Sequence, residues 1–212
     1  MSGIVGSKLN IRGSGRIAKL GTDGQVLTSA GAGTSAVYED IGVVGKQTMW
    51  IPSNAMTPTT SNGAARATVE TTSGRPDMEV LDFDKDSDEF AQFSVAFPKS
   101  WNAGTVTFQF FWSGIAATTG VELTLAGVAF ADNDSIDTAY GTAVAVADAA
   151  QGAVEEMLVS AESGAITIAG SPGANEVSYF RIGRDVSEDN MAGDCRLHGI
   201  KLHFTTNAAN DA

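Results

Sequence analysis

The stretch Trp101 to Ser113, WNAGTVTFQFFWS, constrains the fold of this chain more than any other. From Thr105 onward the residues alternate, so a β-strand would place four large apolar side chains on one face. These side chains are Val106, Phe108, Phe110 and Trp112. Aromatic rings at every second position need an apolar surface opposite them, which a second sheet supplies. The stretch therefore predicts a β-sandwich, and none of its side chains is chemically reactive.

Further runs with strand-like alternation follow and precede this one. They lie at 78–84, 90–97, 121–130, 177–186 and 196–205, and shorter ones lie between them. Pro98 ends the run at 90–97, and a hairpin is the simplest connection to the central strand. With 24 glycines and only 18% charged residues, the composition is typical of strands and turns. We predict an all-β, jelly-roll-like β-sandwich over 47–212, preceded by an extended glycine-rich N-terminal arm over 1–46.

The predicted arm differs from the body in both glycine content and charge. It contains ten of the 24 glycines and one aromatic residue, Tyr38, so it cannot bury enough apolar surface to fold alone. Its apolar residues recur regularly, which favours an arm that orders against a partner over a disordered tail. The residues expected to dock it are Lys8, Ile11, Arg12, Arg16, Lys19, Leu20, Val26 and Leu27.

Charge separates the possible partners. Residues 1–20 hold four basic and no acidic residues, a charge of +4, whereas the other 192 residues hold nine basic and 25 acidic ones, a charge of −16. An acidic body disfavours nucleic acid and anionic membrane surfaces as partners. The basic arm suits an acidic protein surface or nucleic acid, and we favour the protein. No stretch approaches the ~20 apolar residues of a membrane span.

Two groups of residues invite a metal hypothesis. Asp84, Asp86 and Asp88 lie at alternate positions, as oxygen ligands of calcium do, but the stretch does not fit an EF-hand loop. A solvated acidic turn between two strands is the stronger interpretation. Cys195, His198 and His203 are the other group, and in a regular strand His198 faces away from the other two. Structural histidines are therefore favoured over a metal site.

Catalytic motifs are missing from the sequence. It has no glycine-rich phosphate loop leading into a helix, no zinc-ligand spacing and no G-x-S-x-G elbow. Carboxylates are plentiful, so a glycosidase pair stays open, although most carboxylates on an acidic surface are solvated. We predict a non-enzymatic protein that needs no cofactor. Trp50, at the entry to the body, is expected in the core, with a plug between arm and body as the alternative.

Several segments resemble structural proteins of tailed bacteriophages. Gly21 to Glu39, GTDGQVLTSAGAGTSAVYE, is similar to a segment that recurs in tail fibres and virion surface proteins. Leu81 to Ser113, with FPKSWNAGTVTF, resembles virion proteins that have a jelly-roll-like body, as do AITIAGSP, FRIGRDVSED and RLHGIKLHFTT further along. The resemblance implies a virion protein, a homotrimer on a threefold axis and, as partner, the major capsid protein of the phage head.

Two functions follow from this resemblance. The first is a capsid decoration (cement) protein on the outer surface of the head, whose arm clamps onto the shell while the acidic sandwich faces solvent. The alternative is a tail or head fibre protein whose sandwich binds a host surface glycan through an exposed aromatic residue, Phe111 or Trp101. The short chain leaves no room for a fibre shaft, so decoration is the favoured expectation.

Overall fold

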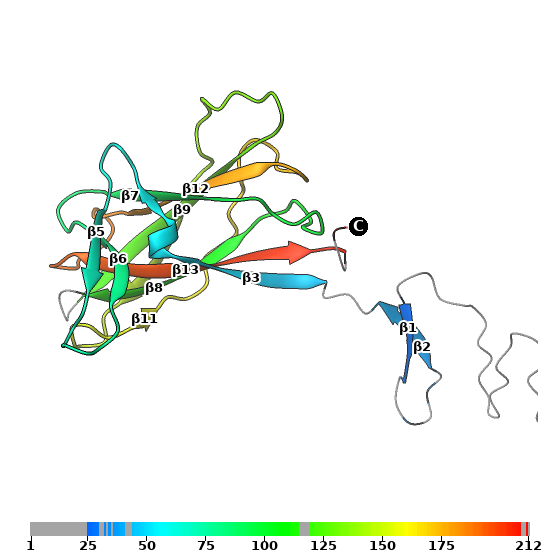
Figure 1. Ribbon diagram of the computed structural model, residues 1–212, viewed down its shortest axis with the longest axis horizontal. Helices are drawn as coiled ribbons and strands as arrows, with labels where there is room; N and C mark the ends of the chain where they lie inside the picture. The colour runs from blue at the N-terminus through cyan, green and yellow to red at the C-terminus, as the bar shows by residue number, and fades with distance from the viewer. Residues whose placement is uncertain are drawn as a thin grey trace, which may run out of the picture.

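The body of the protein is built from two β-sheets packed face to face, seen in a computed structural model that describes residues 25–29, 32, 34, 36–40, 44–114, 119–208 and 211 (Figure 1). The strands are β1 (Gln25–Thr28), β2 (Val37–Asp40), β3 (Gly45–Pro52), β4 (Thr57–Pro58), β5 (Ala65–Val69), β6 (Met78–Phe83), β7 (Phe90–Val95), β8 (Thr107–Gly114), β9 (Gly120–Phe130), β10 (Val144–Ala149), β11 (Leu158–Val159), β12 (Val177–Arg184) and β13 (Cys195–Thr206), with one 3-10 turn, η1 (Ser53–Ala55). Among these residues no helix is long and apolar enough to cross a membrane.

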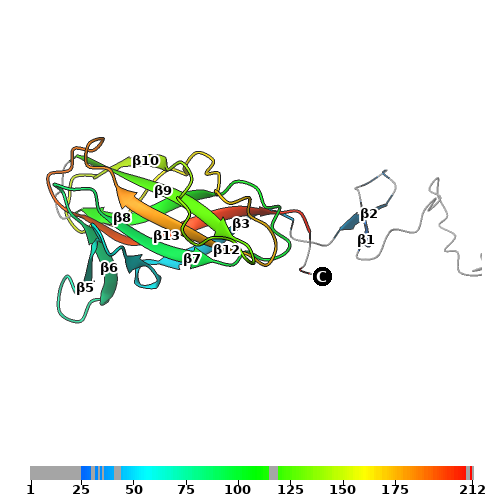
Figure 2. The same cartoon turned by 90° about the horizontal axis from the view of Figure 1, so that it is seen from above.

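The strand order is that of a jelly roll. The six-stranded sheet runs β11-β8-β13-β6-β5, with β3 pairing along the second half of β13. The five-stranded sheet runs β10-β9-β12-β7-β4, and Figure 2 shows the first four of these strands side by side. The rows β6-β13-β8-β11 and β7-β12-β9-β10 interleave along the chain as the two Greek keys of a jelly roll do. The predicted sandwich is confirmed, but β7 and β8 lie in different sheets, so the hairpin expected between them is wrong.

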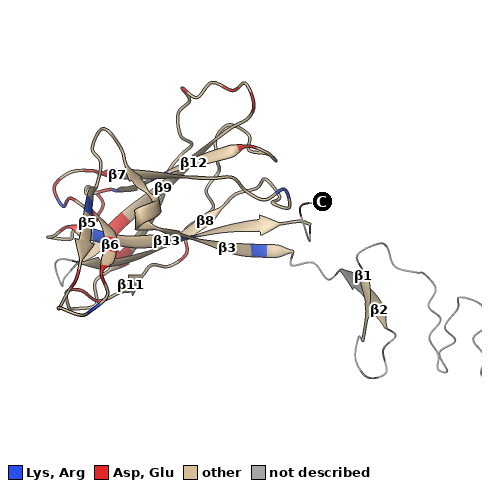
Figure 3. Ribbon diagram, viewed as in Figure 1, with Lys and Arg blue, Asp and Glu red and all other residues tan. Residues whose placement is uncertain are grey.

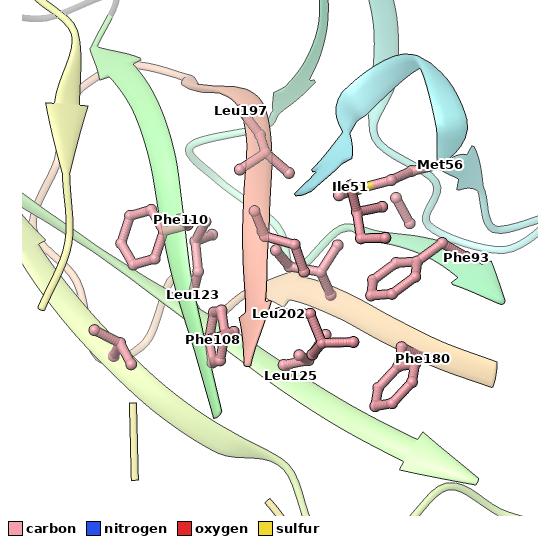
Figure 4. Packing of buried hydrophobic residues seen from close by; sticks show 14 of the residues in the cluster. Ile51, Met56, Phe93, Phe108, Phe110, Leu123, Leu125, Phe180, Leu197 and Leu202 are labelled. Carbon is pink, nitrogen blue, oxygen red and sulfur yellow. The ribbon is translucent and has the colours of Figure 1, made fainter. Parts of the chain in front are cut away.

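The core lies between the two sheets, where the alternation of β8 predicts it. Phe108, Phe110 and Trp112 are fully buried. Figure 4 shows Phe108 and Phe110 beside Leu123 and Leu125 of β9, which belongs to the facing sheet. Fully burying each such side chain contributes roughly 1.5–3 kcal/mol. Trp112 satisfies its indole N–H by donating to Asp148 Oδ2 at 2.7 Å.

A β-bulge changes the direction of side chains in the last strand. The pairing of β13 with β8 shifts between Leu197 and Gly199. Because the bulge inserts one residue, Leu197 and Ile200 both face the core, and His198 turns outward to Ser113 Oγ, 3.0 Å from its Nε2. The face predicted for His198 is therefore wrong, since a regular strand has no such shift.

The described part of the arm is a two-stranded hairpin. β1 and β2 pair antiparallel from Gln25–Asp40 to Thr28–Val37. Figures 1 and 2 show the hairpin set apart from the sandwich, beyond the end at which β3 begins. β3 already starts at Gly45 and pairs with Thr206, so the sandwich includes the last two residues assigned to the arm.

Candidate binding face on the six-stranded sheet

The outward surface of the six-stranded sheet exposes aromatic and polar side chains from three neighbouring strands. Strand register places Trp50 of β3 opposite Lys201 of β13, which lies opposite Gln109 of β8. Two residues along, Thr48, His203 and Thr107 form the next row. We call this surface, with Phe111, the open face. Its residues alternate with core residues along each strand, which is why the same strands build both.

An edge-to-face aromatic pair occupies the centre of the open face. The rings of Trp50 and Phe111 are 5.1 Å apart with an interplanar angle of 89°, and Trp50 is 47% exposed. The two strands that bear them are separated by β13, and Gly199 of β13 leaves the space that the Trp50 ring fills. A Cβ at Gly199 would lie 2.6 Å from Trp50 Cζ2. The prediction that Trp50 lies in the core is wrong. Successive residues of a strand face opposite sides, and here Ile51 faces the core while Trp50 faces outward.

Two polar side chains lie beside the aromatic pair. The Lys201 ammonium lies 5.2 Å from the centre of the Phe111 ring. Gln109 Nε2 donates to the carbonyl of Ser160 at 3.0 Å, which holds the amide over the edge of β8. An aromatic surface with a cation and an amide at its margin can stack on a flat ligand and hydrogen-bond its substituents.

A hydrogen-bonded cluster borders the open face toward the start of β3. Thr48 Oγ1 and His203 Nδ1 are 3.0 Å apart, and Glu162 accepts from both Lys46 and Thr107. Burial lowers the pKa of His203, whereas the hydrogen bond from Lys46 lowers the pKa of Glu162. The histidine therefore favours its neutral form and the glutamate its charged form.

A small hollow of about 150 Å³ borders the other end of the open face. Its lining includes Ser113, Met157 and His198. Arg196 lies there as well and pairs with Asp82 through bonds of 2.9 and 3.2 Å. Burial, and then the charge of Arg196, lowers the pKa of His198. The hollow combines polar side chains with the apolar Met157, and it extends the surface available to an elongated ligand.

A larger groove of about 640 Å³ lies elsewhere, at the end of the sandwich where β7 and β9 finish. Its lining includes Phe97, Lys99, Phe130, Asp132 and Glu176. Figure 3 shows that acidic residues are found mainly in the loops and at strand ends. Glu176 is engaged locally, because it accepts from the backbone N–H of Gly173 at 2.9 Å. Two rings, Phe97 and Phe130, line the groove, and Phe130 packs edge-to-face on Tyr179 with ring centres 5.9 Å apart.

The calcium candidate residues are used in backbone hydrogen bonds. Asp84 Oδ1 accepts from the N–H of Asp86 at 2.6 Å, and Asp88 Oδ1 accepts from Val186 at 3.0 Å. Within the described part of the chain, no three His, Cys, Asp or Glu side chains are placed to hold a metal ion. The turn is instead joined to the end of β12, where the buried Arg184 donates to Asp189 Oδ2 at 2.7 Å and to the Asp84 carbonyl at 3.2 Å.

The structure separates the other residues that the sequence singled out. Trp101 is buried and stacks on Phe97 with ring centres 4.1 Å apart, so of the two aromatic candidates only Phe111 lies on an outward face. Cys195 is buried and faces the core, away from both histidines. Val26 and Leu27 lie on β1 and are 37% and 42% exposed. Lys8, Ile11, Arg12, Arg16, Lys19 and Leu20 lie outside the described residues.

Neither the protein-family models nor the curated proteins include a match to this chain. Solved structures do resemble it at low identity. The family 11 carbohydrate-binding module from Clostridium thermocellum, in complex with a β-1,3-1,4-mixed-linked tetrasaccharide, has a TM-score of 0.43 and 9% identity over 76% of this chain and 96% of its own. The CBM36-1 domain of a multidomain xylanase from the hindgut metagenome of Trinervitermes trinervoides has a TM-score of 0.40 and 10% identity over 74% and 96%. Similarities this remote carry no argument about function.

Proposed function

We propose that this protein is a non-enzymatic glycan-binding protein of a phage virion, in which the N-terminal arm anchors the chain and the open face binds a host surface glycan. The observation that supports this function is the outward-facing Trp50–Phe111 pair, in which Trp50 is 47% exposed and Phe111 is half-buried. Exposed rings grouped with polar side chains are typical of ligand and partner sites, whereas rings that serve packing alone are buried.

The surroundings of the pair suit a sugar chain. A pyranose ring presents apolar C–H groups on its faces and hydroxyl groups around its edge. The indole of Trp50 offers an apolar surface for the first, and Gln109, Lys201 and Thr48 offer donors and acceptors for the second. The surface is open along the strands, which suits an extended oligosaccharide better than a small enclosed molecule.

Substitution of the aromatic pair tests this function. Trp50→Ala is expected to reduce binding to the best oligosaccharide on a glycan array by at least about tenfold, because truncation of a central aromatic contact typically costs more than 1 kcal/mol. Tyr179→Ala is the matched control, because Tyr179 is an exposed aromatic residue, 38% exposed, on the opposite sheet. A protein that binds no oligosaccharide, or one in which both substitutions act equally, would contradict the proposal.

Capsid decoration is a second candidate, supported by the β1–β2 hairpin. Val26, Leu27 and Val37 are between 37% and 42% exposed there. A two-stranded hairpin is marginally stable alone, so exposed apolar residues on it favour contact with another surface. Leu27→Asp should then abolish incorporation into the head. A copy number in fixed ratio to the major capsid protein would favour decoration, and a few copies per virion would favour the fibre.

Both functions include a homotrimer, because a threefold axis would bring three such hairpins together and bury their apolar residues. Sedimentation equilibrium of the full chain is expected to give three times the monomer mass of 21.8 kDa. Leu27→Asp should shift the mass toward that of the monomer. A monomeric wild-type protein would rule out the trimer.

A further inference from the structure

We infer that the glycan bound at the open face is acidic, with a carboxylate, sulfate or phosphate substituent that pairs with Lys201. This inference rests on the proposed function and specifies its ligand. The starting point is the charge balance around the aromatic pair, where the other described cations near the open face, Lys46 and Arg196, already have carboxylate partners.

The ion pairs of the open face leave Lys201 as the exception. Lys46 pairs with Glu162 at one end, and Arg196 pairs with Asp82 at the other end. Among the described residues, Lys201 forms no ion pair, and its ammonium lies 5.2 Å from the centre of the Phe111 ring. A cation over a ring keeps much of its charge available to an anion that approaches from the open side.

The register directs this charge toward the proposed ligand. Lys201 is the direct cross-strand neighbour of Trp50 and, on its other side, of Gln109. Outward side chains directly opposite one another on neighbouring strands have Cβ atoms about 4.5–5.5 Å apart. A sugar stacked on the Trp50 indole therefore presents its edge substituents within reach of the Lys201 ammonium.

The opposite side of the aromatic pair disfavours an anion. Glu155 lines the hollow at that end, and the positive charge of Arg196 there is already paired with Asp82. The acidic body, with a charge of −16 outside residues 1–20, would repel an anionic glycan elsewhere on its surface. The position of Lys201 thus selects glycans that bear one anion on a particular side of the stacked ring.

Paired oligosaccharides test the inference on the full-length protein. The probes are an array of neutral oligosaccharides beside their uronate, sialate and sulfate counterparts, together with oligogalacturonate and its methyl ester. We expect binding to an acidic member at least about tenfold tighter than to its neutral counterpart, since a charge-assisted hydrogen bond is stronger than a neutral one. Sulfate and carboxylate members on the same backbone distinguish the two anions.

Substitutions at one residue separate charge from folding. Lys201→Gln should remove most of the preference for the acidic member, and Lys201→Arg should restore it. Lys99→Gln removes one positive charge in the groove and should leave the preference unchanged. Equal binding of acidic and neutral members, or an acidic preference that survives Lys201→Gln, would overturn the inference while leaving glycan binding intact. An array without any bound member would contradict the proposed function itself, and the inference with it.

Discussion

The two outer faces of the sandwich use aromatic residues in opposite ways. On the five-stranded sheet, the Arg181 guanidinium lies between the rings of Phe90 and Tyr140, at 4.5 and 5.1 Å from their centres. Tyr140 belongs to the loop between β9 and β10, and its hydroxyl lies 3.4 Å from Gln92 Oε1 of β7. On the six-stranded sheet, the Trp50–Phe111 pair has no comparable loop above it among the described residues, and Trp50 is 47% exposed.

The difference indicates which face is free to bind. Ala126 and Val128 are buried, each 2% exposed, although they are not part of the core between the sheets. Arg181, Phe90 and Tyr140 thus satisfy one another on the five-stranded sheet, and we call this surface the covered face, although Tyr179 on β12 is 38% exposed. On the open face the same kinds of side chain are assembled without such a cover.

A substitution in the shared core gives the loss of unfolding free energy with which substitutions on both faces can be compared. Phe110→Ala is expected to lower the free energy of unfolding by about 3–5 kcal/mol, because it leaves a large cavity between the sheets. Urea denaturation followed by circular dichroism measures this change. If substitutions on the covered face cost as much, that face would have to be regarded as a second core.

Substitution of Gly199 should disrupt the open face from beneath. A Cβ there would lie 2.6 Å from Trp50 Cζ2 and 2.7 Å from the Ile51 carbonyl oxygen, and the residue has a φ of +155°. Gly199→Ala is therefore expected to cost about 2–3 kcal/mol through overpacking and backbone strain, and to displace the indole. Urea denaturation and the emission spectrum of the folded protein measure the two effects. An unchanged spectrum and stability would show that Trp50 does not depend on this glycine.

A matched pair of substitutions compares the faces directly. Tyr140→Ala should lower the free energy of unfolding by about 2 kcal/mol, because it removes a ring from Arg181 and uncovers apolar residues. Trp50→Ala should cost about 1 kcal/mol or less, although tryptophan is larger, because much of its ring is exposed. Urea denaturation of both variants measures the difference. The reverse order of costs would mean that Trp50 serves folding, and the binding hypothesis would lose its basis.

The smallest effect is expected from pH. His203 lies on the open face and His198 in the hollow that borders it, and burial lowers the pKa of each. A base whose pKa is lower in the folded state adds stability above its unfolded pKa of about 6.5, and this stability is lost as the pH falls through the folded pKa. His203→Gln should therefore make the fall in unfolding free energy between about pH 7.5 and 5 shallower. Parallel pH profiles for the variant and the wild type would contradict this assignment.

Much of the fold could be predicted because strand alternation is a local property. Val106, Phe108, Phe110 and Trp112 are buried as their spacing requires. The acidic turn at Asp84–Asp88 is also as predicted, because its carboxylates bond to nearby backbone N–H groups. The connection from β7 to β8 could not be predicted, because a hairpin and a crossing between sheets use the same strand pattern.

Only one of the two aromatic residues of the candidate site could be identified from the sequence. Phe111 was identified through the glycan alternative, since it occupies the polar side of an otherwise alternating strand. Trp50 was assigned to the core because a large aromatic residue beside Met49 and Ile51 has no local signal that favours either face. A signal did exist in Gly199, whose missing side chain makes room for a neighbour, but the neighbour is 149 residues away in the chain.

The sequence by itself determined the class of fold and the contrast in charge and glycine content between the N-terminal residues and the rest of the chain, because side-chain periodicity and composition act locally. Only the tertiary structure decided which aromatic residues meet. Trp50 and Phe111 come from β3 and β8, and they touch because β13 lies between those strands with a glycine at the crossing point. The bulge after Leu197 sets which residues of β13 face outward, and this register depends on pairing between distant strands rather than on the order of residues within one.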